Sequence, residues 1–256
     1  MIIDMRDIND YTKSYQSLPF ENIQVQYRRK KVIELLDQYK HDSILEVGCG
    51  MEPLFQFYHD YQCMTIVEPS DIFCKNAREL SDTYDKKIYI VNGNVEKKTK
   101  ELQNRHYDYI IISSLLHELE DPCRVLEEIG KLCIGDEVIH VNVPNAYSLH
   151  RILAYEAGLI PDLYAKSQQQ KKMQQNSTFD LQSITELAEK AGFKVIAEGT
   201  YFPKVFTHGQ MQTLMDMNIL NERLLDGFYQ MEKYLPQFGS ELYVQLQRNG
   251  ERMFSE

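Results

Sequence analysis

The amino-acid sequence predicts an α/β fold in which seven mostly parallel strands form one sheet with helices on both faces. Short apolar runs alternate with helix-length segments over residues 43–143, which is typical of repeated βαβ units. The runs at 110–112 and 138–139 consist of β-branched residues alone, as in strands that are buried on both faces. Both observations favour a central parallel sheet.

The expected elements follow this alternation along the chain. A helical pattern begins at Pro19 and continues to Tyr39. Apolar runs predict strands at 43–47, 64–67, 87–91, 108–113, 137–143, 193–198 and 241–247. Helical patterns predict helices at 54–61, 71–84, 122–133, 148–158, 181–191 and within 208–235. The stretches at 148–158 and 208–235 are helical insertions, one after the fifth strand and one before the last strand.

Composition places the chain among ordinary globular proteins and narrows its partners. Apolar residues make up 43% of the 256 residues and charged residues 26%. No apolar run is long enough to span a membrane and no signal-like stretch begins the chain, so we expect a cytoplasmic protein without membrane insertion. The formal net charge of −10 repels phosphate backbones, so we expect no nucleic-acid partner. Five cysteines without CxxC spacing predict reduced thiols.

A glycine turn after the first expected strand carries the main functional signal. Gly48-Cys49-Gly50 follows the strand, and glycines there let backbone amides approach a ligand. Glu68 ends the next strand, 20 residues after Gly48, where an acid can reach the ribose hydroxyls of an adenine nucleoside. Strand, turn and acid together predict a nucleoside or nucleotide site, with a turn that binds no ligand as the alternative.

The residues around the turn favour a cationic nucleoside over a dinucleotide. A dinucleotide site expects a third glycine where Pro53 stands, and Glu46 would repel its pyrophosphate. S-Adenosylmethionine carries an ammonium and a sulfonium but no phosphate, so an acid at the turn suits it. We therefore expect S-adenosylmethionine as the cofactor and S-adenosylhomocysteine as its product. An NAD-dependent oxidoreductase is the less favoured alternative.

These motifs resemble those of the class I methyltransferases from residue 43 to 143. Their acid-x-Gly-x-Gly turn matches residues 46–50, and the acid that ends their second strand matches Glu68. Their third motif, Gly-Asp, is Gly93-Asn94 here, and their further glycine is absent from Met51-Glu52-Pro53. The fourth motif begins at 107–110 and leads to 113–117, which lies beside the transferable methyl in the family. The resemblance implies a Rossmann-like fold and methyltransferase activity.

The glycine turn and the resemblance together predict the cofactor-binding residues. The resemblance also predicts the role of each region of the chain. We expect one domain over 1–256, with an N-terminal helical lid at 1–42, a cofactor-binding core at 43–143, and helical additions at 144–178 and 203–236 that form the acceptor pocket. The expected cofactor-binding residues are Glu46, Gly48, Cys49, Gly50, Glu68, Pro69, Asn94, Val95, Ser113, Ser114, Tyr15, Arg28 and Arg29.

More narrowly, the chain resembles bacterial methyltransferases that are encoded with capsule and lipopolysaccharide genes. The likeness is carried by Pro-Asn-Ala-Tyr-Ser-Leu-His-Arg at 144–151, by 19–21 and by 27–30. It implies a small-molecule acceptor that is methylated at oxygen, namely a sugar, nucleotide-linked or phosphoramidate intermediate. A non-catalytic partner of another methyltransferase is a further interpretation, and both a monomer and a homodimer stay open.

Two histidines are candidates for the base that an alcohol acceptor requires. His117 follows the fourth strand near the donor methyl, and His150 stands beside Arg151 in the insertion, where the pair could receive an anion. A structural role is the alternative for each. The acids next to His117 are expected to stabilise a helix N-terminus, so we predict no metal site. The expected acceptor-binding residues are Asn145, Tyr147, Arg151, Tyr201 and Lys204, with His208 nearby.

Overall fold

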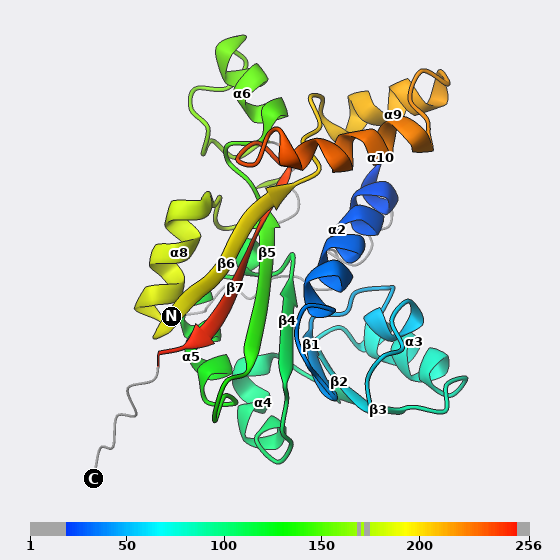
Figure 1. Ribbon diagram of the computed structural model, residues 1–256, viewed down its shortest axis with the longest axis vertical. Coiled ribbons are helices and arrows are strands. Elements are labelled where there is room, and N and C mark those ends of the chain that lie inside the picture. Colours follow the sequence, from blue (N-terminus) through cyan, green and yellow to red (C-terminus); the bar gives the residue numbers. More distant parts are fainter. Residues whose placement is uncertain (1–18, 168–169, 172–174, 250–256) are drawn as a thin grey trace.

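The computed structural model describes residues 19–167, 170–171 and 175–249, and a seven-stranded sheet forms its centre (Figure 1). The strand order is β3-β2-β1-β4-β5-β7-β6. All neighbouring pairs are parallel except the two made by β7, which is antiparallel to β5 and β6. The predicted fold class is confirmed. The strands are β1 (Ser43–Val47), β2 (Cys63–Glu68), β3 (Lys87–Asn92), β4 (Tyr109–Ser113), β5 (Val138–Pro144), β6 (Phe193–Tyr201) and β7 (Glu241–Arg248).

Helices cover both faces of the sheet. One apolar cluster joins the sheet to α4, α5 and α8, and a second joins the opposite face to α2 and α3. The helices are α2 (Glu21–Leu36), α3 (Asp71–Ser81), α4 (Val95–Leu102), α5 (Pro122–Gly130), α6 (Leu149–Glu156), α8 (Leu181–Lys190), α9 (His208–Asp216) and α10 (Glu222–Gln230), and three-residue 3₁₀ turns form η1 (Leu54–Gln56), η2 (Leu116–Glu118) and η3 (Met231–Lys233).

The central strands supply both clusters because successive side chains of a strand point to opposite faces. In β4, Ile110 and Ile112 belong to the cluster under α5, whereas Ile111 belongs to the cluster under α2. In β1, Leu45 and Ile44 divide in the same way. All five side chains are at most 2% exposed. The apolar runs of the sequence therefore mark the doubly covered centre of the sheet.

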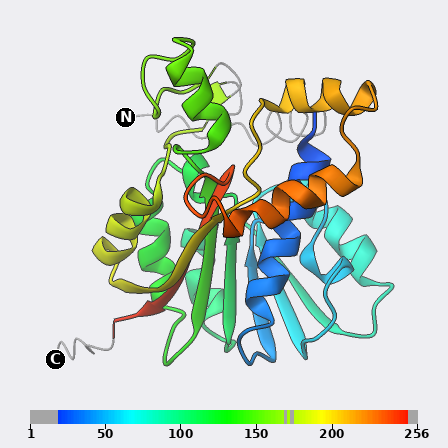
Figure 2. The same cartoon turned by 45° about the horizontal axis from the view of Figure 1, so that its top comes forward.

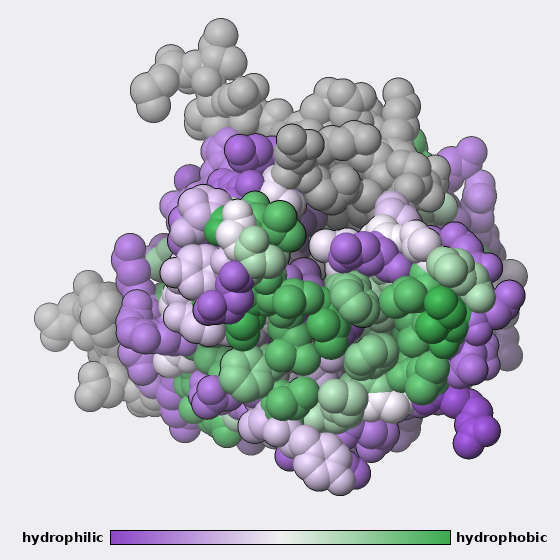
Figure 3. All heavy atoms as spheres, turned by 90° about the horizontal axis from the view of Figure 1, so that it is seen from above, coloured by the Kyte–Doolittle hydropathy of each residue, from purple (hydrophilic) through white to green (hydrophobic). Residues whose placement is uncertain are grey.

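Two helical insertions lie at one end of the sheet, as predicted. The first contains α6 and follows β5; the second contains α9 and α10 and connects β6 to β7 (Figure 2). Seen from above, this end exposes many hydrophobic side chains (Figure 3). The exposed hydrophobic side chains of the two insertions include Leu153 of α6, and Ile219 and Leu224 of the second insertion. The insertions therefore surround the end of the sheet with partly apolar surface.

The helix expected at 54–61 is wrong. Only Leu54–Gln56 forms a helical turn, and the chain then runs on to β2 without further helix. Leu54, Phe55 and Tyr58 are buried with helix-like spacing, but the hydroxyl of Tyr58 donates to Asp37 at 2.9 Å and thereby fixes a non-helical path. Hydrophobic spacing alone does not distinguish these two solutions.

Other predicted elements differ from the structure at their ends. The first helix begins at Glu21 rather than Pro19, because Phe20 has a left-handed φ of 60°, and it ends at Leu36. The helix α4 was not predicted, since Val95–Leu102 has charged residues at five of its eight positions and only a narrow apolar face. The stretch 208–235 is divided into α9 and α10, because Asn221 caps a new helix by accepting from the Leu224 amide.

Truncation of a central-strand side chain should destabilise the protein far more than truncation of an exposed one. Ile139 in β5 is fully buried, whereas Ile134, in the turn before the same strand, is 77% exposed. We expect Ile139→Ala to lower the free energy of unfolding by about 2–5 kcal/mol, and Ile134→Ala to change it by less than about 0.5 kcal/mol. Urea denaturation measures both values, and equal losses would contradict the described core.

Candidate active site

A cavity of about 1540 Å³ lies at the carboxyl-terminal edge of the parallel strands. β1, β2, β4 and β5 end there, and because β7 is antiparallel its first residue, Glu241, pairs with Pro144 at the same edge. Open α/β sheets bind ligands at this edge, next to the point where the strand order reverses. Here the order reverses between β1 and β4. Most of the predicted cofactor and acceptor residues therefore line one common cavity.

Gly48 and Gly50 form the turn that leaves β1. Their φ values are 79° and 58°, in the left-handed region that favours glycine. The amide of Gly48 donates to the carbonyl of Val67 at 2.9 Å, which ties the turn to β2. A Cβ added at Gly50 would meet nothing within 4 Å, so the backbone conformation rather than crowding selects glycine. Both glycines line the cavity.

Glu68 ends β2 with its carboxylate fixed by two backbone amides. Its Oε2 accepts from the amide of Cys49 at 3.1 Å, and its Oε1 accepts from the amide of Ser70 at 2.8 Å. The side chain is only 4% exposed and lines the cavity. The bond from Cys49 links the acid to the glycine turn, which the spacing of 20 residues in the sequence did not reveal. The carboxylate is thus oriented in advance for a ligand.

Glu46 lies beneath the same turn and differs from Glu68 in its surroundings. Its carboxylate accepts from the amide of Leu54 at 3.1 Å and is 8% exposed. Burial, with a smaller contribution from the charge of Glu68, raises the pKa of Glu46 to about 8, although the Leu54 hydrogen bond and Arg29 act in the opposite direction. The acid is therefore largely protonated at pH 7 in the empty site, and a cation beside it would favour its ionised form.

Two arginines of α2 line the cavity but already have protein partners. The guanidinium of Arg28 lies 2.6 Å from Glu241 and 3.5 Å from Glu21. Arg29 lies 2.5 Å from a carboxylate oxygen of Glu52 and 3.4 Å above the centre of the Phe57 ring. Both were predicted to bind the cofactor. Tyr15, predicted for the same role, lies outside the described residues.

The remaining predicted cofactor residues come from three neighbouring loops. The cavity wall includes Pro69 after β2, Asn94 and Val95 at the start of α4, and Ser113 and Ser114 at the end of β4. Ser114 has a left-handed φ of 53° and donates its amide to the carbonyl of Asn142 in β5 at 2.9 Å. The sheet edge thus brings together all the predicted cofactor residues that the structure describes.

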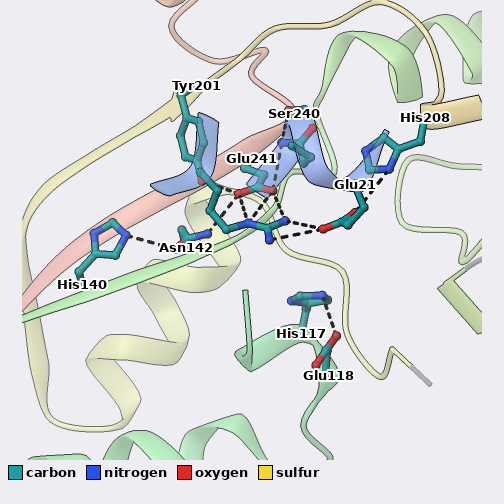
Figure 4. A network of polar contacts seen from close by, with 11 residues as sticks. Glu21, His117, Glu118, His140, Asn142, Tyr201, His208, Ser240 and Glu241 are labelled. Carbon is teal, nitrogen blue, oxygen red and sulfur yellow. Dashed lines mark hydrogen bonds and ion pairs between the residues drawn. The ribbon is translucent and has the colours of Figure 1, made fainter. Parts of the chain in front are cut away.

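His117 lies on η2 immediately beyond β4 and is 2% exposed. Its Nε2 lies 3.8 Å from a carboxylate oxygen of Glu118. Its carbonyl accepts from the amides of Asn176 and Ser177 at 2.8 and 3.0 Å, so the backbone at His117 is held by the segment that precedes β6. The imidazole lines the cavity across from Glu241 (Figure 4).

A buried carboxylate that the sequence analysis did not identify organises the opposite wall. Glu241, 2% exposed, accepts hydrogen bonds from Arg28, from Gln24 at 3.1 Å, from Asn142 at 3.1 Å and from the hydroxyl of Tyr201 (Figure 4). Burial raises its pKa, but the charge and hydrogen bonds of Arg28 outweigh this, so the pKa of Glu241 lies below its usual range. No local motif could reveal this cluster, since its members come from four separate segments.

The predicted acceptor residues divide between the cavity and its surroundings. Asn145, Arg151 and Lys204 line the cavity, as does His150. The guanidinium of Arg151 donates to the carbonyls of Leu163 and Ala165 at 2.9 and 2.7 Å, so it is committed to holding the loop after α6. Asn145 likewise donates to the carbonyls of Gln237 and Gly239 at 3.1 and 2.9 Å.

Two other residues that were predicted to bind the acceptor, Tyr147 and Tyr201, do not line the cavity. Tyr147 is 41% exposed and its ring packs edge-on against Tyr164. Tyr201 is fully buried and donates to Glu241, so it lies behind the wall.

Among the described residues, no three His, Cys, Asp or Glu side chains come together as a metal would require. Of the helices in these ranges, none combines the length and hydrophobicity needed to span a bilayer.

Comparison with solved structures finds the same fold in methyltransferases. The plantazolicin methyltransferase BamL, crystallised with a desmethylplantazolicin analogue and S-adenosylhomocysteine, is 15% identical over 94% of this chain and 96% of its own, with a TM-score of 0.57. A possible histamine N-methyltransferase from Thermotoga maritima is 14% identical over 95% and 97%, with a TM-score of 0.59. An S-adenosylmethionine-dependent methyltransferase from Archaeoglobus fulgidus is 15% identical over 90% and 99%, with a TM-score of 0.54.

Comparison with family profiles and curated sequences completes the assignment. No curated protein sequence matches the chain. The solved structures are too distant in sequence to show more than a common fold. A family profile described as "Methyltransferase domain", however, matches residues 21–198, well over half of the chain and the part that contains the glycine turn, Glu68 and His117. The chain belongs to this family of methyltransferase domains.

Proposed function

We propose that the protein transfers a methyl group from S-adenosylmethionine to a small polar acceptor. The observation that carries this proposal is the position of the Gly48–Gly50 turn beside Glu68 in one cavity wall. The backbone amide of Cys49, within the turn, donates a hydrogen bond to the carboxylate of Glu68. Membership of the methyltransferase family supports it. The presence of S-adenosylhomocysteine in the crystals of BamL, which has the same fold, supports it further.

The cavity wall offers a complementary group for each part of the cofactor. The carboxylate of Glu68 can accept hydrogen bonds from both ribose hydroxyls, and the amide oxygen of Asn94 can accept one from the adenine amino group. Backbone amides of the glycine turn can bind the methionine portion, whose cationic groups suit Glu46. S-Adenosylmethionine supplies an already activated methyl group, so the protein has to align the acceptor and exclude water.

We propose His117 as the group that accepts the proton of an acceptor hydroxyl. The imidazole is buried in the cavity wall directly after β4, and the backbone bonds from Asn176 and Ser177 hold its turn in place. An imidazole titrates near neutral pH, which suits a general base. For the acceptor we propose a sugar, nucleotide-linked or phosphoramidate intermediate of surface-polysaccharide synthesis, methylated at oxygen, on the pattern of residues 144–151.

Removal of the Glu68 carboxylate should weaken cofactor binding. We expect Glu68→Ala to weaken the binding of S-adenosylhomocysteine by about 1.5–3 kcal/mol, because hydrogen bonds to a charged group are lost. Isothermal titration calorimetry measures this change. Glu79→Ala, at a position whose side chain is 68% exposed, is the matched control. Unchanged affinity in Glu68→Ala, or tight binding of NAD to the unaltered protein, would overturn the cofactor assignment.

Cofactor binding should release a proton from Glu46. Because the pKa of Glu46 is about 8 in the empty site and a neighbouring cation lowers it, affinity for S-adenosylmethionine should rise as the pH increases towards 8 and should level off above that value. Calorimetry at pH 7 in buffers with different ionisation enthalpies measures the released proton. Glu46→Gln should abolish the release that Glu46 contributes, and an identical release in this variant would exclude Glu46 as its source.

Replacement of His117 should slow methyl transfer while preserving cofactor binding. We expect His117→Ala to reduce turnover by about 10²–10⁴-fold, the usual contribution of a general base. Turnover is measured with a labelled methyl donor on a panel of hydroxylated acceptors. The exposed His59, which does not line the cavity, provides the control variant His59→Ala. Unaltered turnover in His117→Ala would assign the proton transfer to another group.

A further inference from the structure

Lys204 is a buried cation in the wall of the cavity. It follows β6, and its side chain is among the largest that are nearly inaccessible, with a residue exposure of 2%. Its backbone amide donates to the carbonyl of Phe202 at 2.9 Å, which holds the lysine at the end of a tight turn. Within the described ranges, the ammonium has neither a hydrogen-bond acceptor nor an ion pair within 4.0 Å.

The acids nearest to Lys204 are already bound to another cation. Glu241 and Glu21 both interact with its charge, yet both contact the guanidinium of Arg28, at 2.6 and 3.5 Å. The other titratable groups that face Lys204 are His150 and His208, whose imidazoles interact with it unfavourably when they are protonated. Lys204 is therefore a buried cation of the cavity wall that has no counter-ion of its own.

His150 supplies a second polar atom without a partner in the same wall. Its Nδ1 is buried and makes no hydrogen bond within the described part of the chain. Burial lowers the pKa of His150 well below its usual range, so the ring is neutral at pH 7 and can donate one N–H. An ammonium in a buried residue without a counter-ion and a buried imidazole nitrogen without a partner are both costly, and a ligand anion would satisfy both.

The position of Lys204 in the sheet assigns this anion to the acceptor side of the cavity. The glycine turn and Glu68 lie at the ends of β1 and β2, whereas Lys204 follows β6. Four strand steps separate β1 from β6 in the order of the sheet. His150 belongs to the insertion after β5, on the same side as Lys204. Lys204 and the glycine turn thus lie at the ends of strands that are well separated in the sheet.

We propose that Lys204 and His150 form an anion-binding subsite that receives a carboxylate or phosphate group of the methyl acceptor. This inference rests on the proposed methyl transfer, and it specifies the acceptor as a molecule with an anionic group. It replaces the expected pair of His150 and Arg151, because backbone carbonyls already occupy Arg151. Burial lowers the pKa of Lys204 to about 8, which leaves the side chain mostly charged at pH 7 and able to bind the anion.

The test uses the full chain saturated with S-adenosylhomocysteine, with inorganic phosphate and acetate as probes. Each anion is titrated while the imidazole resonances of His150 are followed by NMR at pH 7. We expect Lys204→Met to weaken anion binding by about tenfold to a hundredfold, the loss of one hydrogen bond between charged groups. Lys204→Arg should retain binding, and Lys194→Met, which removes an exposed lysine of β6, should behave like the unaltered protein.

Two further measurements distinguish this subsite from other roles of Lys204. S-Adenosylhomocysteine affinity should be unchanged in Lys204→Met; a loss as large as that for phosphate would assign the lysine to the cofactor carboxylate and overturn the inference. The melting temperature of Lys204→Met should rise, because a buried ammonium without a counter-ion is removed. The subsite would be refuted if the unaltered protein bound neither anion, or if Lys204→Met bound them as tightly as the unaltered protein. If S-adenosylhomocysteine still bound in these experiments, the proposed methyl transfer would stand.

Discussion

The contact between Glu241 and Arg28 joins the parts of the molecule that enclose the cavity. Glu241 is the first residue of β7, Arg28 belongs to α2, and Asn142 of β5 donates to the same carboxylate. Each separate charge would be expensive to bury, but in the pair each charge has an opposite charge as its partner. Helix α2 is thereby fixed over the edge of the sheet, and its position defines the side of the cavity opposite His117.

The two acids of the cofactor site illustrate how similar residues acquire different properties. Two backbone amides hold the carboxylate of Glu68, whereas Glu46 has one amide and a pKa of about 8. The first is arranged as a fixed acceptor for hydroxyl groups. The second is arranged as a group whose charge depends on a nearby cation. This arrangement, together with the absence of a third glycine at Pro53, is the basis of the predicted preference for a cationic nucleoside over a phosphate-bearing one.

The insertions give the common fold its individual cavity. Without them, the ends of β1, β2 and β4 would form an open edge. The insertion after β5 contributes His150, and the loop between β6 and α9 contributes Lys204. The proposed acceptor residues His150 and Lys204 therefore come from elements that lie outside the repeated βαβ units.

The sheet, the glycine turn and the acid at Glu68 could be predicted from the sequence, because strand periodicity, glycine conformation and chain spacing are local properties. The twelve described residues that were predicted to bind the cofactor, from Glu46 to Ser114 together with Arg28 and Arg29, all line one cavity. Four features are visible only in the folded molecule: Glu241 meets Arg28, Arg151 holds a loop, Tyr201 lies behind the wall, and Lys204 lines the cavity. Those facts depend on contacts between distant segments, and the non-helical path after Leu54 depends on them as well.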